Sequence, residues 1–595
     1  MFLNIFKYKN LINLFTKLTK IEFLIILMMF GIHISFISLE PYLPIIWSIS
    51  IIYLYKKKYF YVAINSYIIL LLFLFADKIN FGIIGFRTQM AYSSLMLLIM
   101  FSFIFLFQEL SQKISKKLIL LFTIMITIIL YSLPLFYIIY SISFHIGITK
   151  DIIYAMNQTN FQESLEFAQS FLSLYWLLLI IFLVTLSTIL LTQQSKMKTT
   201  KIKKSTLVFL LFFMLTNVIV FRNKTQLFIF LKNATTEYEK ALSLFKNEQD
   251  KMRTGKIVFH ANKDNKGETY IVIIGESLNK YHMGIYGYDK KTTPYLSAIS
   301  HSYLKFNNSY SNHTHTMPVL SLALTEANQL NNKSFYNSLS IINILNKANF
   351  ETYWVSNQNM YGKWDNLVSI IAHQADSLFS INHVSGETTR TQKYDAEVLK
   401  PIKNILSKYN SNKNKIIFVH LIGSHTNYCG RYPSEFKKFN FLNGTSDKIN
   451  CYDNSVLYND YVIYSILKLL KSSKGIKGLI YMSDHGEDID RGLGHNSSKF
   501  TYDMTQIPLI MWFSPEYKEK YPSLYKNLNK NINKLFSNDL FYDSLLGIMQ
   551  VNTQHYNSKY DLSSSTFMLK DSEAYTLHGK RKYVDVKNLF YTPKK

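Results

Sequence analysis

Four ionisable side chains follow directly after three short apolar runs in the C-terminal half of the chain. They are Glu276 after residues 270–274, His425 after residues 416–421, and Asp484 with His485 after residues 478–482. Carboxylate oxygens and imidazole nitrogens are the ligands by which proteins hold zinc and similar divalent ions. A single acid or histidine has ordinary structural uses, but charges placed at a buried strand end need compensation. The set therefore predicts a divalent-metal site.

The apolar runs are the elements that must position these residues. Each is short and continuous, which is typical of a strand buried on both faces of a parallel sheet. Residues 507–512 could form a fourth strand, and helical patterns at 336–348 and 454–472 lie between the runs. Alternating strands and helices predict an α/β domain with a mainly parallel sheet. In such sheets chemistry occurs beyond the carboxyl ends of the strands, where the four ionisable residues lie.

The N-terminal half has a different composition. The 595 residues carry a net charge of +26, but residues 1–222 hold only 19 Lys/Arg and 7 Asp/Glu, against 46 and 32 in the remainder. We read seven apolar runs in this half, and each is a candidate membrane span. They are residues 22–39, 42–55, 59–76, 90–108, 118–143, 168–192 and 206–221. The second and last are short, so five to seven spans are expected, with seven preferred.

Basic residues between the runs predict the orientation. Fifteen lie before the first run and in every second loop after it, whereas the other loops hold three. The positive-inside rule then places the N-terminus in the cytoplasm and the chain after Phe221 outside. A cleaved signal peptide is disfavoured because no small-residue cleavage site lies near Ser38 and Glu40. Basic residues that cluster between apolar runs do not indicate nucleic-acid binding, and we expect none.

The chain is thus expected to comprise three parts. Residues 1–221 form a helical membrane domain, residues 222–268 a polar linker with an amphipathic helix at about 236–248, and residues 269–595 an extracytoplasmic α/β domain. Two cysteines exclude a disulfide-rich scaffold and allow one bridge at most.

Several further motifs occur in a fixed order around the strand ends. The first group is Gly275-Glu276-Ser277, Tyr286-Gly287-Tyr288 and Thr292-Thr293-Pro294. The second is Gly423-Ser424-His425, Arg431-Tyr432-Pro433, Tyr452-Asp453-Asn454 and Tyr458-Asn459-Asp460. The third is Ser483-Asp484-His485-Gly486-Glu487 with Gly494-His495. This ordered set, over about 270–515, resembles the membrane phosphoethanolamine transferases, which belong to the sulfatase branch of the alkaline phosphatase superfamily.

The resemblance implies roles for individual residues. Glu276, Asp484 and His485 match the ligands of one catalytic zinc, and a second zinc is known among such relatives. Thr316 falls where the family has its nucleophilic threonine, which also binds the metal; Thr314 and Ser277 are the alternatives. His425 and His495 match histidines near the substrate head group or near a second zinc, and Lys333 is a weaker match to a head-group contact. Cys429 and Cys451 would form one bridge, which stabilises a loop by about 3 kcal/mol in the chain-entropy model.

The implied reaction moves phosphoethanolamine from phosphatidylethanolamine to an envelope acceptor through a covalent adduct on Thr316. Lipid A, a core sugar, another glycan or a protein are all acceptable acceptors, and the inner membrane is the expected location. A phosphoglycerol transferase of the lipoteichoic acid synthase kind is the alternative enzyme. A formylglycine-dependent sulfatase is disfavoured because residues 313–322 contain neither Cys nor Arg. A membrane-anchored binding protein with an inactive site is the remaining, non-enzymatic alternative.

Overall fold

The computed structural model describes residues 57–82, 84–158, 172–198, 200–358, 367–382, 393–440 and 447–583, with single residues 47, 51, 54 and 164. The chain divides into two compact units. One comprises Met1–Tyr154 and Phe167–Thr236, and the other comprises Ala155–Glu166 and Glu237–Lys595. The division falls at residues 236 and 237, within the linker expected from the sequence.

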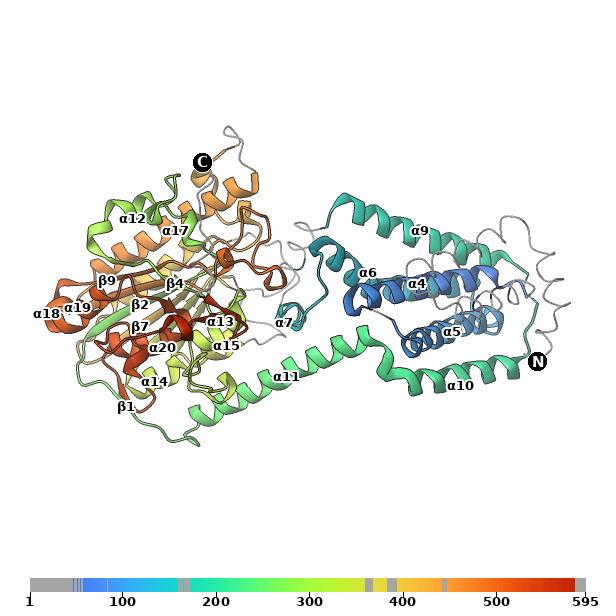
Figure 1. Cartoon of the computed structure of the whole chain (residues 1–595), viewed down its shortest axis with the longest axis horizontal. Helices are drawn as coiled ribbons and strands as arrows, with labels where there is room; N and C mark the ends of the chain where they lie inside the picture. Colours follow the sequence, from blue (N-terminus) through green and yellow to red (C-terminus); the bar gives the residue numbers. More distant parts are fainter. Residues whose placement is uncertain are drawn as a thin grey trace. The chain divides into compact units, whose positions relative to one another are not determined.

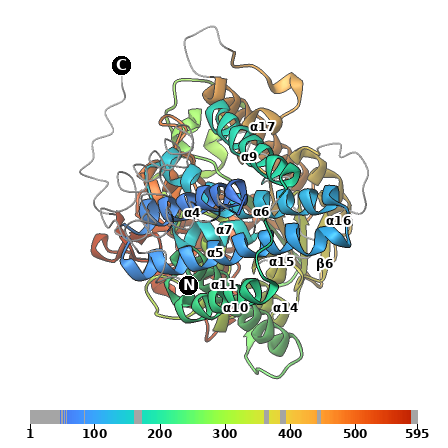
Figure 2. The same ribbon diagram turned by 90° about the vertical axis from the view of Figure 1, so that its right-hand side faces the viewer.

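Five helices of the first unit are long and apolar enough to cross a membrane. They are α4 (Phe60–Phe81), α5 (Phe86–Gln108), α6 (Lys116–Phe144), α9 (Leu174–Lys196) and α10 (Lys204–Phe221). Helix α4 packs against α5, α6 and α9, and α5 also packs against α10 (Figures 1 and 2). These helices correspond to the last five expected runs. The first two runs, 22–39 and 42–55, lie almost wholly outside the described residues, so the total number of spans stays a prediction.

Buried polar groups join the helices of this unit. The Tyr92 hydroxyl of α5 donates to the Asp77 carboxylate of α4 at 2.8 Å and accepts the backbone N–H of Leu227 at 3.2 Å. The Tyr137 hydroxyl of α6 donates to the Leu227 carbonyl at 3.3 Å. A buried polar group in an apolar helix bundle is costly unless it is paired. The beginning of helix α11 (Gln226–Arg253) is therefore tied by hydrogen bonds to α5 and α6.

Helix α11 is longer than the amphipathic stretch expected at 236–248. Its residues from Glu237 onward belong to the second unit, where Phe245 is fully buried beside Phe335. The Gln249 amide donates to the Ser338 carbonyl at 3.0 Å and accepts the Gln374 amide at 2.8 Å. Its apolar and polar contacts together explain why the helix continues to Arg253.

A seven-stranded sheet forms the centre of the second unit. Its order is β3 (Leu304–Phe306), β9 (Leu509–Phe513), β8 (Ile476–Ser483), β2 (Glu268–Gly275), β7 (Asn414–His420), β5 (Phe350–Ser356) and β6 (Ser377–Ser380). Strands β8, β2, β7, β5 and β6 are parallel, whereas β9 is antiparallel to both of its neighbours. The expected mainly parallel sheet is confirmed, and the fourth expected run is β9.

Both faces of the sheet are covered by helices, as Figure 1 shows. In β2, Tyr270, Val272 and Ile274 enter one apolar core, and Ile271 with Ile273 enters the other. This two-sided burial explains why the strands are continuous apolar runs. The first core contains α13 (Thr316–Ala323), α14 (Ile341–Lys347), α15 (Leu367–Ala372), α18 (Pro515–Lys520), α19 (Pro522–Lys530) and α20 (Phe541–Ile548). The second contains α12 (Pro294–Ala298), α16 (Leu399–Ser407) and α17 (Asp447–Lys471).

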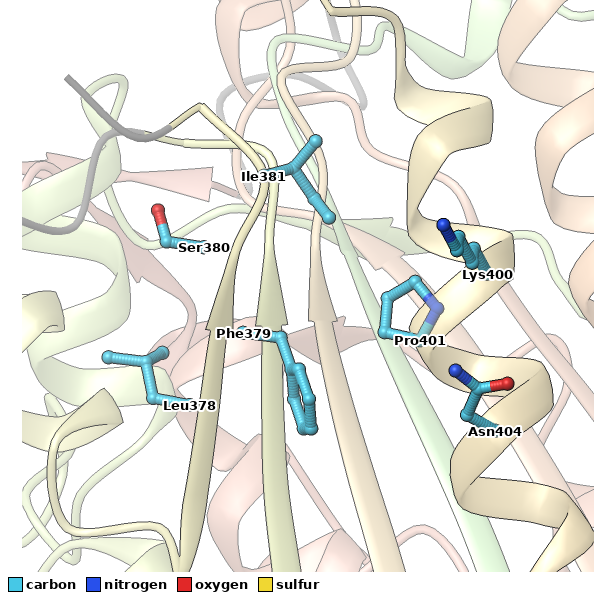
Figure 3. Close-up of a pocket in the computed structure, with 7 residues that line it drawn as sticks. All are labelled: Leu378, Phe379, Ser380, Ile381, Lys400, Pro401 and Asn404. Atoms are coloured by element: carbon cyan, nitrogen blue, oxygen red, sulfur yellow. The ribbon is translucent and has the colours of Figure 1, made fainter. Parts of the chain in front are cut away.

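An open groove of about 450 Å³ lies beside β6, the edge strand of the sheet. Figure 3 shows Phe379 on the strand side, and Pro401 and Asn404 on the α16 side. None of the expected metal ligands lines this groove. The groove is therefore separate from the candidate site, which forms at the carboxyl ends of β2 and β8.

Candidate active site

The register of two central strands brings the expected ligands together. Strands β2 and β8 are parallel neighbours, and their last residues, Gly275 and Ser483, face each other. The backbone N–H of Asp484 continues the ladder by donating to the Gly275 carbonyl at 3.0 Å. Glu276 and Asp484 are the next residues on the two strands, so both leave the same edge of the sheet side by side.

Glu276, Asp484 and His485 form a compact, buried cluster. One ligand atom of each lies within 4.8 Å of those of the other two. The Nε2 atom of His485 is 3.3 Å from Glu276 Oε1 and 3.6 Å from Asp484 Oδ2. Each residue is at most 1% exposed. Three of the four expected metal ligands thus converge on one point.

Hydrogen bonds around the cluster leave atoms free to bind a cation. Asp484 Oδ1 accepts the N–H groups of Ser277 and His485, whereas Asp484 Oδ2 is buried without a hydrogen-bond partner among the described residues. His485 Nδ1 lies 2.9 Å from the Gly486 carbonyl, so it carries a proton and directs Nε2 toward the carboxylates. An orphaned carboxylate oxygen facing an imidazole nitrogen suits a divalent ion such as zinc.

The electrostatics of the cluster agree with this fit. Burial, reinforced by the charge of Glu276, raises the pKa of Asp484 above its usual range. Although burial opposes charge, Asp484 and Glu276 raise the pKa of His485 to about 10. His485 in turn holds the pKa of Glu276 well below its usual range despite burial. Two buried carboxylates therefore require positive charge between them, which a proton on His485 or a dication would supply.

Thr316 is the accessible hydroxyl beside this cluster. Its Oγ1 atom donates to Glu276 Oε2 at 3.0 Å, and the side chain is half-buried at the first residue of α13. The two alternatives are fully buried. Ser277 donates to Glu276 Oε1 at 2.7 Å, and Thr314 is paired with His315 Nδ1 at 2.9 Å. Exposure therefore favours Thr316 as the hydroxyl that a substrate can reach.

Histidine rings surround the cluster. The His495 ring lies 4.7 Å from the His485 ring, 5.2 Å from that of His315 and 6.3 Å from that of His425. His495 Nδ1 is 2.8 Å from the buried Glu487 carboxylate, which fixes the orientation of the ring. Desolvation is the main cause that lowers the pKa of His425 to about 4. Both histidines expected from the sequence thus lie near the candidate metal ligands.

Lys333 has a different environment. Its ammonium pairs with Glu326, whose carboxylate also lies 3.0 Å from His555 Nδ1. No described hydrogen bond or ion pair joins Lys333 to the ligand cluster, so its head-group role stays a prediction.

A disulfide joins Cys429 to Cys451. It links the loop after β7 to the first turns of α17 across a separation of 22 residues. Closing a loop of this length restricts the unfolded chain and contributes roughly 3 kcal/mol in the chain-entropy model. The neighbouring Tyr428 is buried against Tyr452, so the bridge also fixes part of the loop that carries His425.

Two supporting residues were not found by sequence reasoning. The Gln358 amide donates to Glu276 Oε2 at 3.3 Å and to the Leu421 carbonyl at 3.1 Å. The Asp395 carboxylate accepts the N–H groups of Ile422 and Gly423 at 3.0 and 2.9 Å. Neither belongs to a recognisable motif. Gln358 follows the end of β5 by two residues, but residues 350–356 were not among the strands expected from the sequence, and Asp395 lies far from any strand end. Glu487 lies inside a motif, but only the structure reveals its contact with His495.

The remaining motifs hold the site's framework together. The Asp460 carboxylate accepts the first N–H groups of α12, from Tyr295 and Leu296, at 2.8 and 3.0 Å. The Asp453 carboxylate lies 2.8 Å from His282 Nδ1 and 2.6 Å from the Lys290 ammonium. Both acids lie on α17, so these contacts fasten that helix to the loop after β2. Some of the motif residues therefore hold the framework of the site together rather than taking part in its chemistry.

The family and sequence matches of this chain to known proteins concern its C-terminal unit. Residues 268–551 match the family model described as sulfatase. This stretch lies within the C-terminal unit and is just under half of the chain. The expected resemblance of this unit to phosphoethanolamine transferases is confirmed. Phosphoethanolamine transferase EptC of Escherichia coli (strain K12) is 31% identical over 284 residues, which are 44% of this chain and 48% of that protein. The chain thus matches about half the length of this curated relative.

Solved structures agree with the sulfatase domain and with the helical unit. The C-terminal periplasmic domain of E. coli EptC, in complex with Zn, is 27% identical with a TM-score of 0.50, covering 54% of this chain and 94% of that one. The integral membrane lipooligosaccharide phosphoethanolamine transferase A of Neisseria meningitidis is 19% identical with a TM-score of 0.51, covering 80% of this chain and 92% of that one. The second likeness concerns the fold, which includes N-terminal helices and a sulfatase domain.

The geometry predicts that Gly423 cannot be replaced by alanine without moving Glu276. Gly423 has a φ of +54°, and a Cβ atom there would lie 2.6 Å from the Glu276 carbonyl oxygen and 2.8 Å from its nitrogen. We expect Gly423→Ala to lower the free energy of unfolding by more than about 1 kcal/mol and to weaken metal retention. Thermal unfolding and metal content of the purified full chain provide the measurements.

Gly255→Ala is the matched control, because Gly255 has a φ of +73° with open space around its Cβ position. The alanine in this variant would have the unfavourable positive φ but no steric clash. Equal unfolding temperatures and equal metal content in the two variants would contradict the role of the Gly423–Glu276 contact.

Proposed function

We propose that the chain transfers phosphoethanolamine from phosphatidylethanolamine to an envelope acceptor through an adduct on Thr316. One observation carries the proposal: the only accessible hydroxyl among Thr316, Thr314 and Ser277 donates to Glu276 inside a buried metal-type cluster. A sulfatase-type enzyme needs such a nucleophile, and the 31% identity to E. coli phosphoethanolamine transferase EptC indicates the group transferred. The acceptor supplies a hydroxyl or phosphate oxygen on lipid A, a core sugar, another glycan or a protein.

Zinc is the proposed cofactor. Glu276, Asp484 and His485 would hold the ion, with Thr316 Oγ1 beside it, and the E. coli relative was solved in complex with Zn. When bound, a divalent ion lowers the pKa of a neighbouring hydroxyl and offsets the charge that develops on phosphoryl oxygens. The histidines around the cluster are of a residue type that binds zinc, and a second ion stays part of the proposal.

The chain's own residues would carry the remaining steps. The Thr316 hydroxyl releases its proton to solvent, its oxygen attacks phosphorus, and the bond from phosphorus to the diacylglycerol oxygen breaks. His495 or His425 donates a proton to that leaving oxygen. The acceptor oxygen then attacks the phosphothreonine adduct and loses its proton to the same imidazole, the bond from phosphorus to Thr316 breaks, and the freed Thr316 oxygen takes up a proton from solvent. Glu487 holds His495 at Nδ1, so Nε2 of that ring is the atom left for proton transfer.

The proposed location is the cytoplasmic membrane, with the sulfatase domain on its outer side. Five described helices are long and apolar enough to span it, and the basic loops place the N-terminus inside. The Cys429–Cys451 bridge suits an oxidising compartment. A lipid donor lies in the same bilayer as the helices, so tethering raises its local concentration at the site.

Head-group-labelled phosphatidylethanolamine tests the nucleophile. After incubation with the purified full chain and rapid acid quenching, we expect the label on the peptide that contains Thr316. Thr316→Ala should abolish labelling, whereas Thr314→Ala should retain it. Label on another peptide, or a glycerol-type adduct from phosphatidylglycerol instead, would refute the assignment.

Removal of one ligand charge tests the metal. We expect Asp484→Asn to lose most of its zinc and its labelling activity, because the orphaned Oδ2 carries the charge that faces the cation. Metal analysis of the purified chain and circular dichroism give the readouts, since helix content should remain. A variant with full zinc content would contradict the ligand role.

The orientation of His495 can be tested separately. We expect Glu487→Gln to lower the turnover rate by about tenfold to hundredfold, as is typical when a group supporting a site residue is removed, with zinc content retained. Glu519→Gln, at an exposed position on α18, is the control. Loss of zinc in parallel with activity would show instead that Glu487 acts through the metal.

A further inference from the structure

His315 stands immediately before Thr316, and none of the proposed steps uses its side chain. It occupies the N-cap position of α13, with Thr316 as the first helical residue. The His315 carbonyl accepts the N–H of Val319 at 3.1 Å, but its side chain makes no capping hydrogen bond. The imidazole therefore does not perform the usual task of an N-cap side chain, which is to satisfy the first N–H groups of the helix.

The contact at Nδ1 determines where the His315 ring carries its hydrogen. Nδ1 lies 2.9 Å from the hydroxyl of Thr314, which is fully buried and has no other hydrogen-bond partner among the residues that the structure describes. A buried hydroxyl hydrogen without an acceptor is costly, so Thr314 donates to Nδ1. A neutral imidazole that accepts at one nitrogen carries its hydrogen on the other. His315 Nε2 is therefore a hydrogen-bond donor, and a protonated ring would carry a hydrogen there as well.

This donor faces the open side of the site. The two nitrogens of an imidazole point in roughly opposite directions, so Nε2 points away from the buried Thr314. His315 is half-buried, as are Thr316, His425 and His495. In the described part of the chain His315 Nε2 has no hydrogen-bond partner, yet it is not one of the fully buried polar atoms that lack one. It is thus within reach of a bound substrate.

Neighbouring side chains place the His315 ring beside the reacting oxygen. The ring lies edge-to-face with that of His495 at 5.2 Å, and the His495 ring lies 4.7 Å from that of His485. His485 Nε2 and Thr316 Oγ1 both contact the Glu276 carboxylate, at 3.3 and 3.0 Å. The phosphoryl group that bonds to Thr316 Oγ1 must enter the space bordered by these rings.

We propose that His315 Nε2–H donates a hydrogen bond to a non-bridging oxygen of the phosphoryl group that Thr316 attacks. The inference rests on the proposed function. The hydrogen stays on His315 throughout, so the bonds that form and break are those already described for the two displacements. The contact stabilises the charge that the non-bridging oxygens carry in the transition state, as a fixed donor aimed at a reacting anion does in other enzymes.

Single-turnover labelling measures this contribution. The full chain is mixed with vesicles that contain head-group-labelled phosphatidylethanolamine, and the appearance of label on Thr316 is timed. We expect His315→Ala to slow labelling by about a hundredfold to a thousandfold, the usual effect of removing one such donor, while zinc content and unfolding temperature are retained. His315→Gln should recover part of the rate, because its amide can also donate.

His301→Ala is the matched control, because His301 is an exposed histidine in the connection after α12. It should label Thr316 at the normal rate. Labelling by His315→Ala that is as fast as labelling by His301→Ala would overturn the proposal.

Sulfur substitution distinguishes a direct contact from a structural role. Phosphatidylethanolamine with sulfur in place of one non-bridging oxygen exists as two diastereomers, and sulfur is a weak hydrogen-bond acceptor. Only one diastereomer places sulfur where His315 donates. We expect His315→Ala to change the ratio of the two labelling rates by about tenfold, which corresponds to the loss of roughly one hydrogen bond. If both rates fell equally, His315 would be structural and the proposal would be overturned.

Phosphate binding covers the case in which the lipid gives no label on Thr316. That result would refute the proposed function but leave the His315 contact testable. Inorganic phosphate is then titrated calorimetrically into the zinc-loaded full chain and its variants. We expect His315→Ala to weaken binding by about tenfold relative to the unmodified chain and to His301→Ala. Equal affinity in all three, or no binding to the unmodified chain, would overturn the proposed contact.

Discussion

Two carboxylates forced together in a dry environment are the constraint on which the site depends. The β2–β8 register places Glu276 and Asp484 at the same height on adjacent strands, and both are buried. Their repulsion is tolerated only if positive charge lies between them. His485 supplies part of it, and Asp484 Oδ2, which has no hydrogen-bond partner among the residues that the structure describes, is available to a cation. The pairing of β2 with β8 therefore determines where the candidate metal ligands lie.

The surroundings of the cluster make this arrangement rigid. Ser277, at a φ of +58°, directs its N–H to Asp484 while its hydroxyl reaches Glu276. Gly423 passes so close to the Glu276 backbone that no side chain fits, and Asp395 holds the turn before it. Each contact limits a different degree of freedom of the ligands. Side chains held this firmly would need little reorganisation to bind a cation.

Much of this could be predicted from sequence, for identifiable reasons. The strands that carry Glu276, Asp484 and His425 are buried on both faces, which leaves an uninterrupted apolar run followed by polar residues. The C-terminal edge rule then gathers those residues at one place. Gln358 was missed because residues 350–356 alternate buried and partly buried positions and were not recognised as a strand, and Asp395 because a hydrogen bond from a distant loop leaves no local signal. The length of α11 was underestimated because its start depends on contacts with Tyr92 and Tyr137 rather than on its own amphipathic pattern.

The reversed direction of β9 has a consequence for how such a domain can diversify. A parallel strand after β8 would require the chain to return to the far edge of the sheet, usually through a helix. Because β9 runs antiparallel to β8, residues 484–508 start and finish at the reactive edge and never leave it. This excursion carries the candidate ligands Asp484 and His485 at its start, followed by Glu487 and His495. A change in the length or composition of this one connection would therefore move candidate ligands and their supporting side chains together.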